Sequence, residues 1–271
     1  MTSRRSPIAL LKGILAPSPR TFRGLLHAAN SRYGVDIDWQ PGDERVVVLA
    51  PHMDDEVLGC GGAIALHHRA GASVTVVFLT DGRQGSAALD GLHGAALRAA
   101  QEELVAVRKA EAERARVDLG IDELVFLDAA DGALAEDAGA AGKLKTVLEK
   151  CRPQIVYLPS HLEQHPDHRA ASALIMAAVA ATSLDFACHA YEVWTPLYAN
   201  CLVGIDSVID TKRRALAQYR SQLAEADFEH GIVGLNAYRA MLRPRPGRRY
   251  AEAFVALPLR EYLSMWRQFS T

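Results

Sequence analysis

The sequence contains no pair of cysteines spaced as CxxC, because its four cysteines lie far apart, at Cys60, Cys151, Cys188 and Cys201. This excludes a cysteine zinc site and a dithiol redox motif, and it favours a reducing, cytoplasmic location. No stretch reaches the ~20 apolar residues that a transmembrane helix needs. Net charge is also small, −2 over 271 residues, which argues against a nucleic-acid-binding protein.

The charge that is present is unevenly distributed. Residues 1–35 contain six basic side chains and no acidic one, so the remaining residues carry a net charge of −8. Lys12 and Gly13 interrupt the apolar stretch that follows Pro7, and no clear cleavage site follows, so we do not expect a signal peptide. Two interpretations stay open for 1–35: a basic helix that makes peripheral contact with an anionic membrane, or a helix that packs on the domain.

Short apolar runs rich in β-branched residues alternate with longer segments of helical composition. Such runs are typical of strands buried on both faces of a parallel sheet, and they occur at 46–50, 74–79, 124–127 and 155–158. Helices are expected at about 59–70, 98–119, 142–151 and 167–182. Further strands are expected at 188–194, 202–209 and 253–257, with helices near 211–226 and 234–242. This order predicts an α/β fold, a Rossmann-like three-layer sandwich with a mostly parallel sheet and helices on both faces.

Ligands bind at the carboxyl ends of the strands in such sheets. Two of the predicted strands are followed by Pro-His-Met-Asp-Asp-Glu at 51–56 and His-Pro-Asp-His at 165–168. A catalytic zinc takes three protein ligands, so one His and one Asp from the first segment and one His from the second satisfy the count. A carboxylate and an imidazole remain for proton transfer. Iron and manganese accept similar ligands.

Each segment also has a purely structural interpretation. Asp54, Asp55 and Glu56 precede a predicted helix, where carboxylates cap the first turn and complement the helix dipole. Pro166 suits the first position of the next helix. Capping does not explain why three imidazoles should converge on the same edge of one sheet.

Together the two segments resemble the paired signature of the LmbE-like, or PIG-L, zinc-dependent N-deacetylases. Further counterparts of that family's pattern are Gly59-Cys60-Gly61-Gly62, Arg108 with Glu111, Asp131-Gly132, Ser221-Gln222 and Ala251-Glu252-Ala253-Phe254. The resemblance therefore covers about residues 45–257. It divides the chain into a basic N-terminal extension, 1–40, and a deacetylase domain, 41–271.

The resemblance implies that His52, Asp55 and His168 hold Zn²⁺, or another divalent metal such as Fe²⁺. Asp54 would be the general base, and His165 would stabilise the oxyanion or protonate the leaving amine. Carboxylates close to His165 in the sequence would favour its protonated form. The implied reaction is removal of an N-acetyl group from an N-acetylglucosamine-type conjugate by zinc-activated water.

Substrate contacts are expected from Arg108, Asp131 and Glu163. Arg108 and Asp131 suit sugar hydroxyls or a phosphate, and their structural alternatives are a helix ion pair and a turn aspartate. Glu163 occupies a position at which some family members have an oxyanion-assisting tyrosine, so it would meet a substrate hydroxyl or amine, or face solvent. Residues 82–97 form a long loop that we expect to cover the substrate.

The expected partner is a small N-acetylated sugar or glycoconjugate, and no nucleic acid. One alternative is an amidase that acts on another N-acyl or thiol conjugate. Another is a metal-free carbohydrate-binding relic of the same fold. The presence of every residue of the expected metal and catalytic set argues against the relic.

Overall fold

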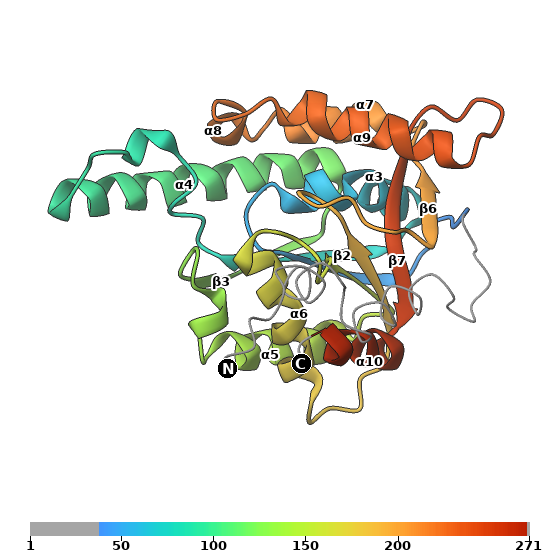
Figure 1. Cartoon of the computed structure of the whole chain (residues 1–271), viewed down its shortest axis with the longest axis horizontal. Coiled ribbons are helices and arrows are strands. Elements are labelled where there is room, and N and C mark those ends of the chain that lie inside the picture. The colour runs from blue at the N-terminus through green and yellow to red at the C-terminus, as the bar shows by residue number, and fades with distance from the viewer. Residues whose placement is uncertain (1–37, 270–271) are drawn as a thin grey trace, which may run out of the picture.

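A seven-stranded sheet organises the part of the chain that the computed structural model describes, residues 38–269, with side chains as far as residue 267 (Figure 1). Its strands are β1 (Arg45–Ala50), β2 (Ser73–Thr80), β3 (Glu123–Ala129), β4 (Ile155–Pro159), β5 (Ala187–Tyr191), β6 (Cys201–Gly204) and β7 (Ala251–Pro258). The helices are α3 (Asp55–Ala70), α4 (Gly94–Leu119), α5 (Ala140–Cys151), α6 (Pro166–Val179), α7 (Ile209–Leu216), α8 (Arg220–Leu223), α9 (Phe228–Leu242) and α10 (Leu259–Phe269).

The strand order is β3-β2-β1-β4-β5-β7-β6. Strands β1 to β5 pair in parallel, and β7 runs antiparallel to both β5 and β6. The predicted mostly parallel α/β sheet is therefore confirmed. Strands β2 and β3 follow β1 toward one edge of the sheet. Strand β4 then pairs with the other side of β1, and the later strands extend the sheet toward the opposite edge. The carboxyl ends of β1 and β4 thus flank the switch point at which such sheets bind ligands.

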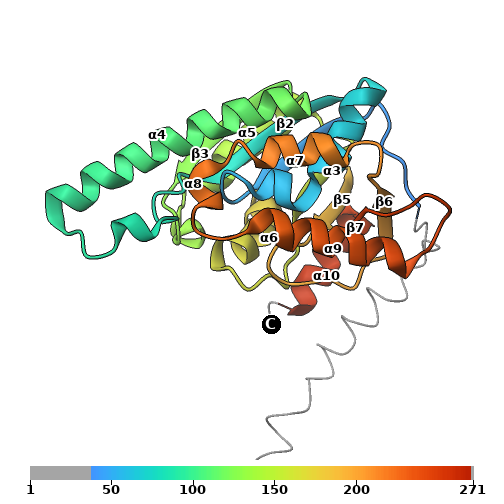
Figure 2. The same cartoon turned by 90° about the horizontal axis from the view of Figure 1, so that it is seen from above.

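Helices cover both faces of the sheet, as predicted. Figures 1 and 2 show α3, α4, α7 and α9 on one face and α5, α6 and α10 on the other. Alternate residues of β1 enter the two layers, since Val46 and Val48 belong to one apolar cluster, and Val47 and Leu49 belong to the other. Burial of β1 on both faces explains its uninterrupted apolar sequence.

Several boundaries differ from the sequence-based expectation. The helix expected at 211–226 is divided into α7 and α8 by a turn at 217–219, and the strand expected at 202–209 ends at Gly204. Helix α4 begins at Gly94, so the preceding loop is shorter than 82–97. The sequence patterns did not predict helix α10, although Leu259, Tyr262 and Met265 are buried at helical spacing.

The expected N-terminal extension lies outside the described residues, except for its last three residues. Of these, Asp38 forms a bridge with Leu202, and the backbone N–H of Trp39 donates to Leu202 O at 3.1 Å. These residues therefore already pack on the domain. Across residues 38–269, no helix combines the length and apolar character needed to cross a membrane.

Helix α3 is broken at Cys60, whose φ of −146° is not helical. Across the break, the ammonium of Lys212 donates to Leu58 O at 3.0 Å and to the carboxylate of Glu252 at 2.6 Å. Glu252 in turn accepts the N–H groups of Gly62 and Ala63, both at 2.8 Å. This buried pair thus satisfies backbone groups that the break frees from helical hydrogen bonding.

Close packing next to this break requires glycine at positions 59 and 62. A Cβ at Gly59 would lie 2.2 Å from the ring of Tyr191, and one at Gly62 would lie 2.5 Å from the side chain of Ile205. Both distances are far below van der Waals contact, so the Gly-Cys-Gly-Gly sequence lets the helix approach its neighbours.

We expect Lys212→Met to lower the free energy of unfolding by about 3 kcal/mol, because it leaves the Glu252 carboxylate buried without its counter-ion. Urea unfolding followed by circular dichroism measures this change. Lys145→Met is the control, since Lys145 makes only a solvent-exposed 3.8 Å pair with Glu149 and should change stability by less than about 1 kcal/mol. Equal effects of the two substitutions would contradict this account.

Candidate active site

The two histidine-containing segments meet at the switch point of the sheet. The segment after β1 carries His52 into α3, and the segment after β4 carries His165 and His168 into α6. The ring centroid of His52 lies 4.7 Å from that of His165 and 5.5 Å from that of His168. The convergence predicted from the strand ends is therefore confirmed.

His52 is held by carboxylates on both sides of its ring. Its Nε2 lies 3.1 Å from Asp131 Oδ1 and 3.2 Å from Asp167 Oδ2, whereas Nδ1 lies 3.3 Å from Asp55 Oδ2. Burial alone would lower the pKa of His52, but these three carboxylates outweigh it and hold that pKa well above its usual range. When Nε2–H donates to Asp131 or Asp167, the other nitrogen, Nδ1, faces the Asp55 carboxylate. A cation bound between Nδ1 and this carboxylate is favoured by both groups.

His168 is fully buried, and neither of its ring nitrogens has a hydrogen-bond partner among the described residues. Its Nε2 nevertheless lies 3.1 Å from Asp55 Oδ2. Although burial would raise the pKa of Asp55, His168 and His52 hold it well below its usual range. A buried nitrogen that lacks a hydrogen bond and lies beside a carboxylate oxygen shared with His52 fits a divalent metal held by His52, Asp55 and His168.

Two groups of donor atoms lie within 4.8 Å of one another in the described residues, and Asp55 belongs to neither: His52 with His165 and His168, and His52 with Asp131 and Asp167. In the second group the carboxylates have other partners. Asp167 accepts the N–H groups of Gly132 and Leu134, and Asp131 accepts that of Gln84. These two carboxylates are therefore better placed to orient His52 than to bind a metal themselves.

Asp54 does not cap α3. Its backbone has a φ of 140°, which is strained for a residue with a side chain, and its carboxylate makes no capping hydrogen bond. The carboxylate instead lies 3.6 Å from Arg108 Nη2. Burial raises the pKa of Asp54 to about 7, although Arg108 acts in the opposite direction. The capping interpretation is therefore wrong for Asp54.

His165 is the N-cap residue of α6, and Pro166 begins the helix, as its structural interpretation predicts. His165 Nδ1 accepts the N–H of Asp167 at 3.3 Å, so in the neutral ring the proton is on Nε2. Burial, together with His52 and His168, lowers the pKa of His165, and Asp167 does not compensate. The expectation of a protonated His165 is therefore not supported by this environment.

A cavity of about 180 Å³ connects these groups. It is lined by His52, Asp54, Asp55, Leu58, Gln84, Gly85, Arg108, Asp131, His165, Trp194 and Gln222. The guanidinium of Arg108 is fixed at its wall by donation to Met53 O at 2.9 Å and to Gly82 O at 3.1 Å. Glu111 accepts hydrogen bonds from Ser221 instead, so the expected alternative of an Arg108–Glu111 helix pair is wrong.

Comparison with known proteins identifies the family. The profile of the PIG-L family, described as GlcNAc-PI de-N-acetylase, matches residues 47–179. A conserved protein of known structure from Thermus thermophilus, TT1542, is 31% identical with a TM-score of 0.63, and the match covers 78% of this chain and 93% of that one. The chain belongs to the PIG-L (LmbE-like) family.

Two curated proteins with names that state a deacetylase activity also match most of the chain. The diacetylchitobiose deacetylase of Thermococcus kodakarensis is 29% identical over 231 residues, which cover 79% of this chain and 84% of that protein. The probable N-acetyl-alpha-D-glucosaminyl L-malate deacetylase 2 of Bacillus anthracis is 28% identical, with 70% of this chain and 89% of that protein covered. The family match that the two sequence motifs predicted is confirmed.

In this PIG-L protein Glu163 neither faces solvent nor lines the cavity. It is 1% exposed, and its carboxylate accepts the backbone N–H groups of Val193 at 2.7 Å, Trp194 at 3.0 Å and Thr195 at 3.4 Å. Its Oε2 also lies 3.8 Å from Nδ1 of His168. The solvent-facing interpretation is wrong, and this geometry favours a supporting position over the expected substrate contact.

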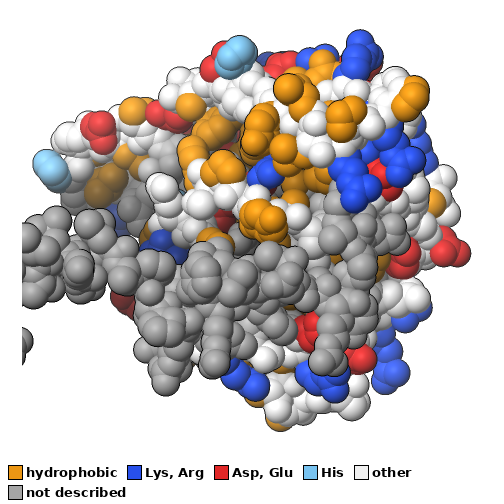
Figure 3. All heavy atoms as spheres, turned by 45° about the vertical axis from the view of Figure 1, so that its right-hand side comes forward, with side chains coloured by type: hydrophobic (Ala, Val, Ile, Leu, Met, Phe, Trp, Pro, Cys, Tyr) orange, Lys and Arg blue, Asp and Glu red, His pale blue; other side chains and the backbone are white. Residues whose placement is uncertain are grey.

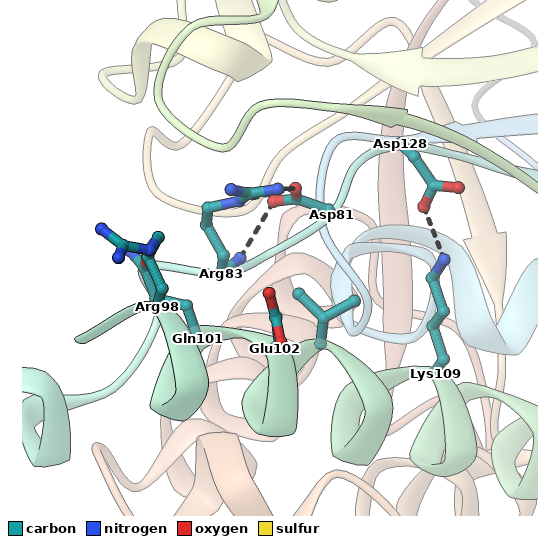
Figure 4. Close-up of a pocket in the computed structure, with 8 residues that line it drawn as sticks. Asp81, Arg83, Arg98, Gln101, Glu102, Lys109 and Asp128 are labelled. Carbon is teal, nitrogen blue, oxygen red and sulfur yellow. Dashed lines mark hydrogen bonds and ion pairs between the residues drawn. The ribbon is translucent and has the colours of Figure 1, made fainter. Parts of the chain in front are cut away.

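A larger cavity, of about 310 Å³, is lined by residues of α4, by Asp81 and Arg83 after β2, and by Asp128 of β3 (Figure 4). Four of its charged lining residues form ion pairs: Arg83 with Asp81, and Lys109 with Asp128 at 2.6 Å. It lacks imidazoles among its lining residues. The smaller cavity is therefore the candidate active site.

The sequence-based reasoning missed two contributors to the site. The sequence predicts Asp167 only as a carboxylate in the first turn of a helix. In the structure its carboxylate contacts both His52 Nε2 and a backbone N–H group of the segment after β3. Trp194 carried no motif, and it reaches the cavity from the loop after β5. The position of Asp167 between two histidines was an available signal, whereas Trp194 had none.

Glu163→Ala should lower the free energy of unfolding by about 2–4 kcal/mol, since it leaves at least two backbone N–H groups without their acceptor. Thermal and urea unfolding of the purified variant measure the loss. Glu149→Ala, at a half-exposed position on α5, provides the comparison and should shift stability by about 0.5 kcal/mol or less. A Glu163→Ala protein as stable as the wild type would refute the anchoring role.

Proposed function

We propose that this chain is a metal-dependent N-deacetylase that hydrolyses the acetamide of an N-acetylglucosamine-type conjugate. The observation that carries this proposal is the position of Asp55 Oδ2, 3.3 Å from His52 Nδ1 and 3.1 Å from His168 Nε2, with the Asp54 carboxylate in the same cavity. The named family members support the amino-sugar substrate class. We assign this activity to the domain expected over 41–271.

His52, Asp55 and His168 would hold the metal. This mixture of imidazole and carboxylate suits Zn²⁺ and also accepts Fe²⁺. When bound, such an ion lowers the pKa of a water molecule and polarises the amide carbonyl. Asp131 and Asp167 act through His52, because their bonds to Nε2 fix the ring with Nδ1 directed toward Asp55. Asp131 is thus a positioning residue in this proposal.

Asp54 is the general base of the proposed reaction. It takes a proton from the attacking water while the water oxygen bonds to the carbonyl carbon. A carboxylate whose pKa is raised toward neutrality is suited to this exchange. The buried guanidinium of Arg108, 3.6 Å away, keeps the carboxylate directed at the cavity.

His165 stabilises the carbonyl oxygen in the proposed reaction. Its neutral ring carries a proton on Nε2, which can donate a hydrogen bond to the carbonyl oxygen as negative charge develops there. When the carbon–nitrogen bond breaks, the proton held by Asp54 passes to the departing amine. The products are acetate and the free amino sugar. Arg108 completes the proposed substrate contacts, since its guanidinium lines the cavity and its Nε has no partner among the described residues.

Metal analysis tests the first part of this proposal. Purified protein should contain about one zinc or iron ion per chain. Chelation should abolish amine release from N-acetylated sugars, and added Zn²⁺ should restore it. A protein that remains metal-free after reconstitution would favour the carbohydrate-binding relic. Activity only toward other N-acyl or thiol conjugates would favour the amidase alternative.

Asp54→Asn should reduce kcat about 10²–10⁴-fold, because the amide cannot accept the proton. Its metal content should stay unchanged, as Asp54 is not among the proposed ligands. Kinetics with a saturating N-acetylated sugar, together with metal analysis, measure both quantities. Asp128→Asn is the matched control, since this half-exposed aspartate lies outside the catalytic cavity. Full activity of the Asp54→Asn protein would overturn the assignment of the base.

A further inference from the structure

We propose that Trp194 forms a substrate subsite at the mouth of the catalytic cavity, where its indole stacks on the ring of the group attached to the N-acetylated sugar. This inference rests on the proposed function, because it assumes that the sugar's acetamide lies beside Asp54. It assigns a ligand, a glycosidically linked ring, to a part of the surface that no motif identified.

The exposure of Trp194 is the first observation. Its side chain is 51% exposed, and it is the single exposed large hydrophobic residue among the described ones that also lines the catalytic cavity. Tyr238, Met241 and Leu242 of α9 are exposed as well. Figure 3 shows one face of the molecule, with hydrophobic side chains gathered in its upper part. A large apolar side chain at a cavity mouth is typical of a binding site.

The indole is presented by a loop whose backbone is fixed. Glu163 accepts the N–H of Trp194 and of both its neighbours. Farther along the loop, Glu192 accepts the N–H of Leu197 at 2.7 Å and pairs with the buried Arg239 of α9. A surface loop without a ligand to position gains little from two buried carboxylates that hold its main chain.

The orientation of the ring is also fixed. Phe228, at the start of α9, contacts the indole edge-to-face, with centroids 5.7 Å apart and an interplanar angle of 72°. Such a contact stabilises one ring orientation. Trp194 therefore offers a preformed aromatic surface rather than a freely rotating side chain.

The size of the cavity indicates which part of a substrate reaches this surface. About 180 Å³ is below the ~300–1,000 Å³ usual for sites that enclose a whole drug-sized ligand. The cavity therefore accommodates little more than one acetamido sugar, and the attached group emerges at the mouth. A pyranose or aryl ring has an apolar face that matches the indole, while the polar side chains of Gln84, Arg108 and Gln222 line the cavity itself.

The experiment compares three substrates: N-acetylglucosamine, its β-linked dimer and its p-nitrophenyl glycoside. Trp194→Ala should raise KM about tenfold for the dimer and the aryl glycoside, as expected for loss of one stacked ring. We expect kcat for all three, and KM for the monosaccharide, to change by less than about threefold. Trp194→Phe, which keeps an aromatic face, should recover most of the loss.

Tyr198→Ala is the matched control, because Tyr198 is 68% exposed on the same loop but does not line the cavity. It should leave all three KM values unchanged. The subsite is overturned if Trp194→Ala leaves KM for the dimer unchanged, or if it raises KM equally for the monosaccharide. It is also overturned if Tyr198→Ala has the same effect as Trp194→Ala.

Intrinsic fluorescence gives a readout that does not require turnover. The chain contains three tryptophans, Trp39, Trp194 and Trp266. The deacetylated dimer should change the emission of the wild-type protein but not that of Trp194→Phe. If no N-acetylated sugar is hydrolysed while this signal persists, the proposed function fails, and the ring-binding surface at Trp194 stands without the assumed position of the acetamide. Turnover of the dimer without such a signal removes the subsite and keeps the proposed function.

Discussion

The buried pair of Lys212 and Glu252 is the interaction on which the arrangement of the site depends. A continuous helix after β1 would satisfy its own backbone and would not need an ion pair from α7 and β7. The break at Cys60 lets the first turns of α3 approach Tyr191, but it frees backbone groups that only a buried donor and acceptor can satisfy. Segments far apart in the chain thereby fix the turn that presents Asp54 and Asp55.

Carboxylates position the imidazole rings of His52 and His168. Asp55 lies between His52 and His168, Asp167 joins His52 to the next loop, and Glu163 lies against the far side of His168. Each of these three acids has donors or a cationic neighbour that opposes its desolvation. The net negative charge of the domain is therefore partly concentrated inside it, where a bound cation would be favoured.

The fold was predictable from local sequence because the central strands are buried on both faces and read as uninterrupted apolar runs. The convergence of His52, His165 and His168 followed from the rule that places ligands at the ends of parallel strands. The role of Glu163 did not, because its three partners are backbone groups about thirty residues away, and backbone groups carry no sequence signal. The same limit applies to Trp194, whose position depends on that carboxylate. Helix α10 is a different case, because the apolar spacing of Leu259, Tyr262 and Met265 was an available signal.

Glu163 holds the loop after β5 through main-chain N–H groups and not through side chains. These hydrogen bonds can form with any side chain at positions 193–195 except proline, which has no N–H group. The loop's chemistry can change by single substitutions while the proposed metal ligand His168, on the other side of the same carboxylate, keeps its surroundings. This separation makes the loop a natural point at which a deacetylase could acquire a new substrate preference without rebuilding its reactive centre.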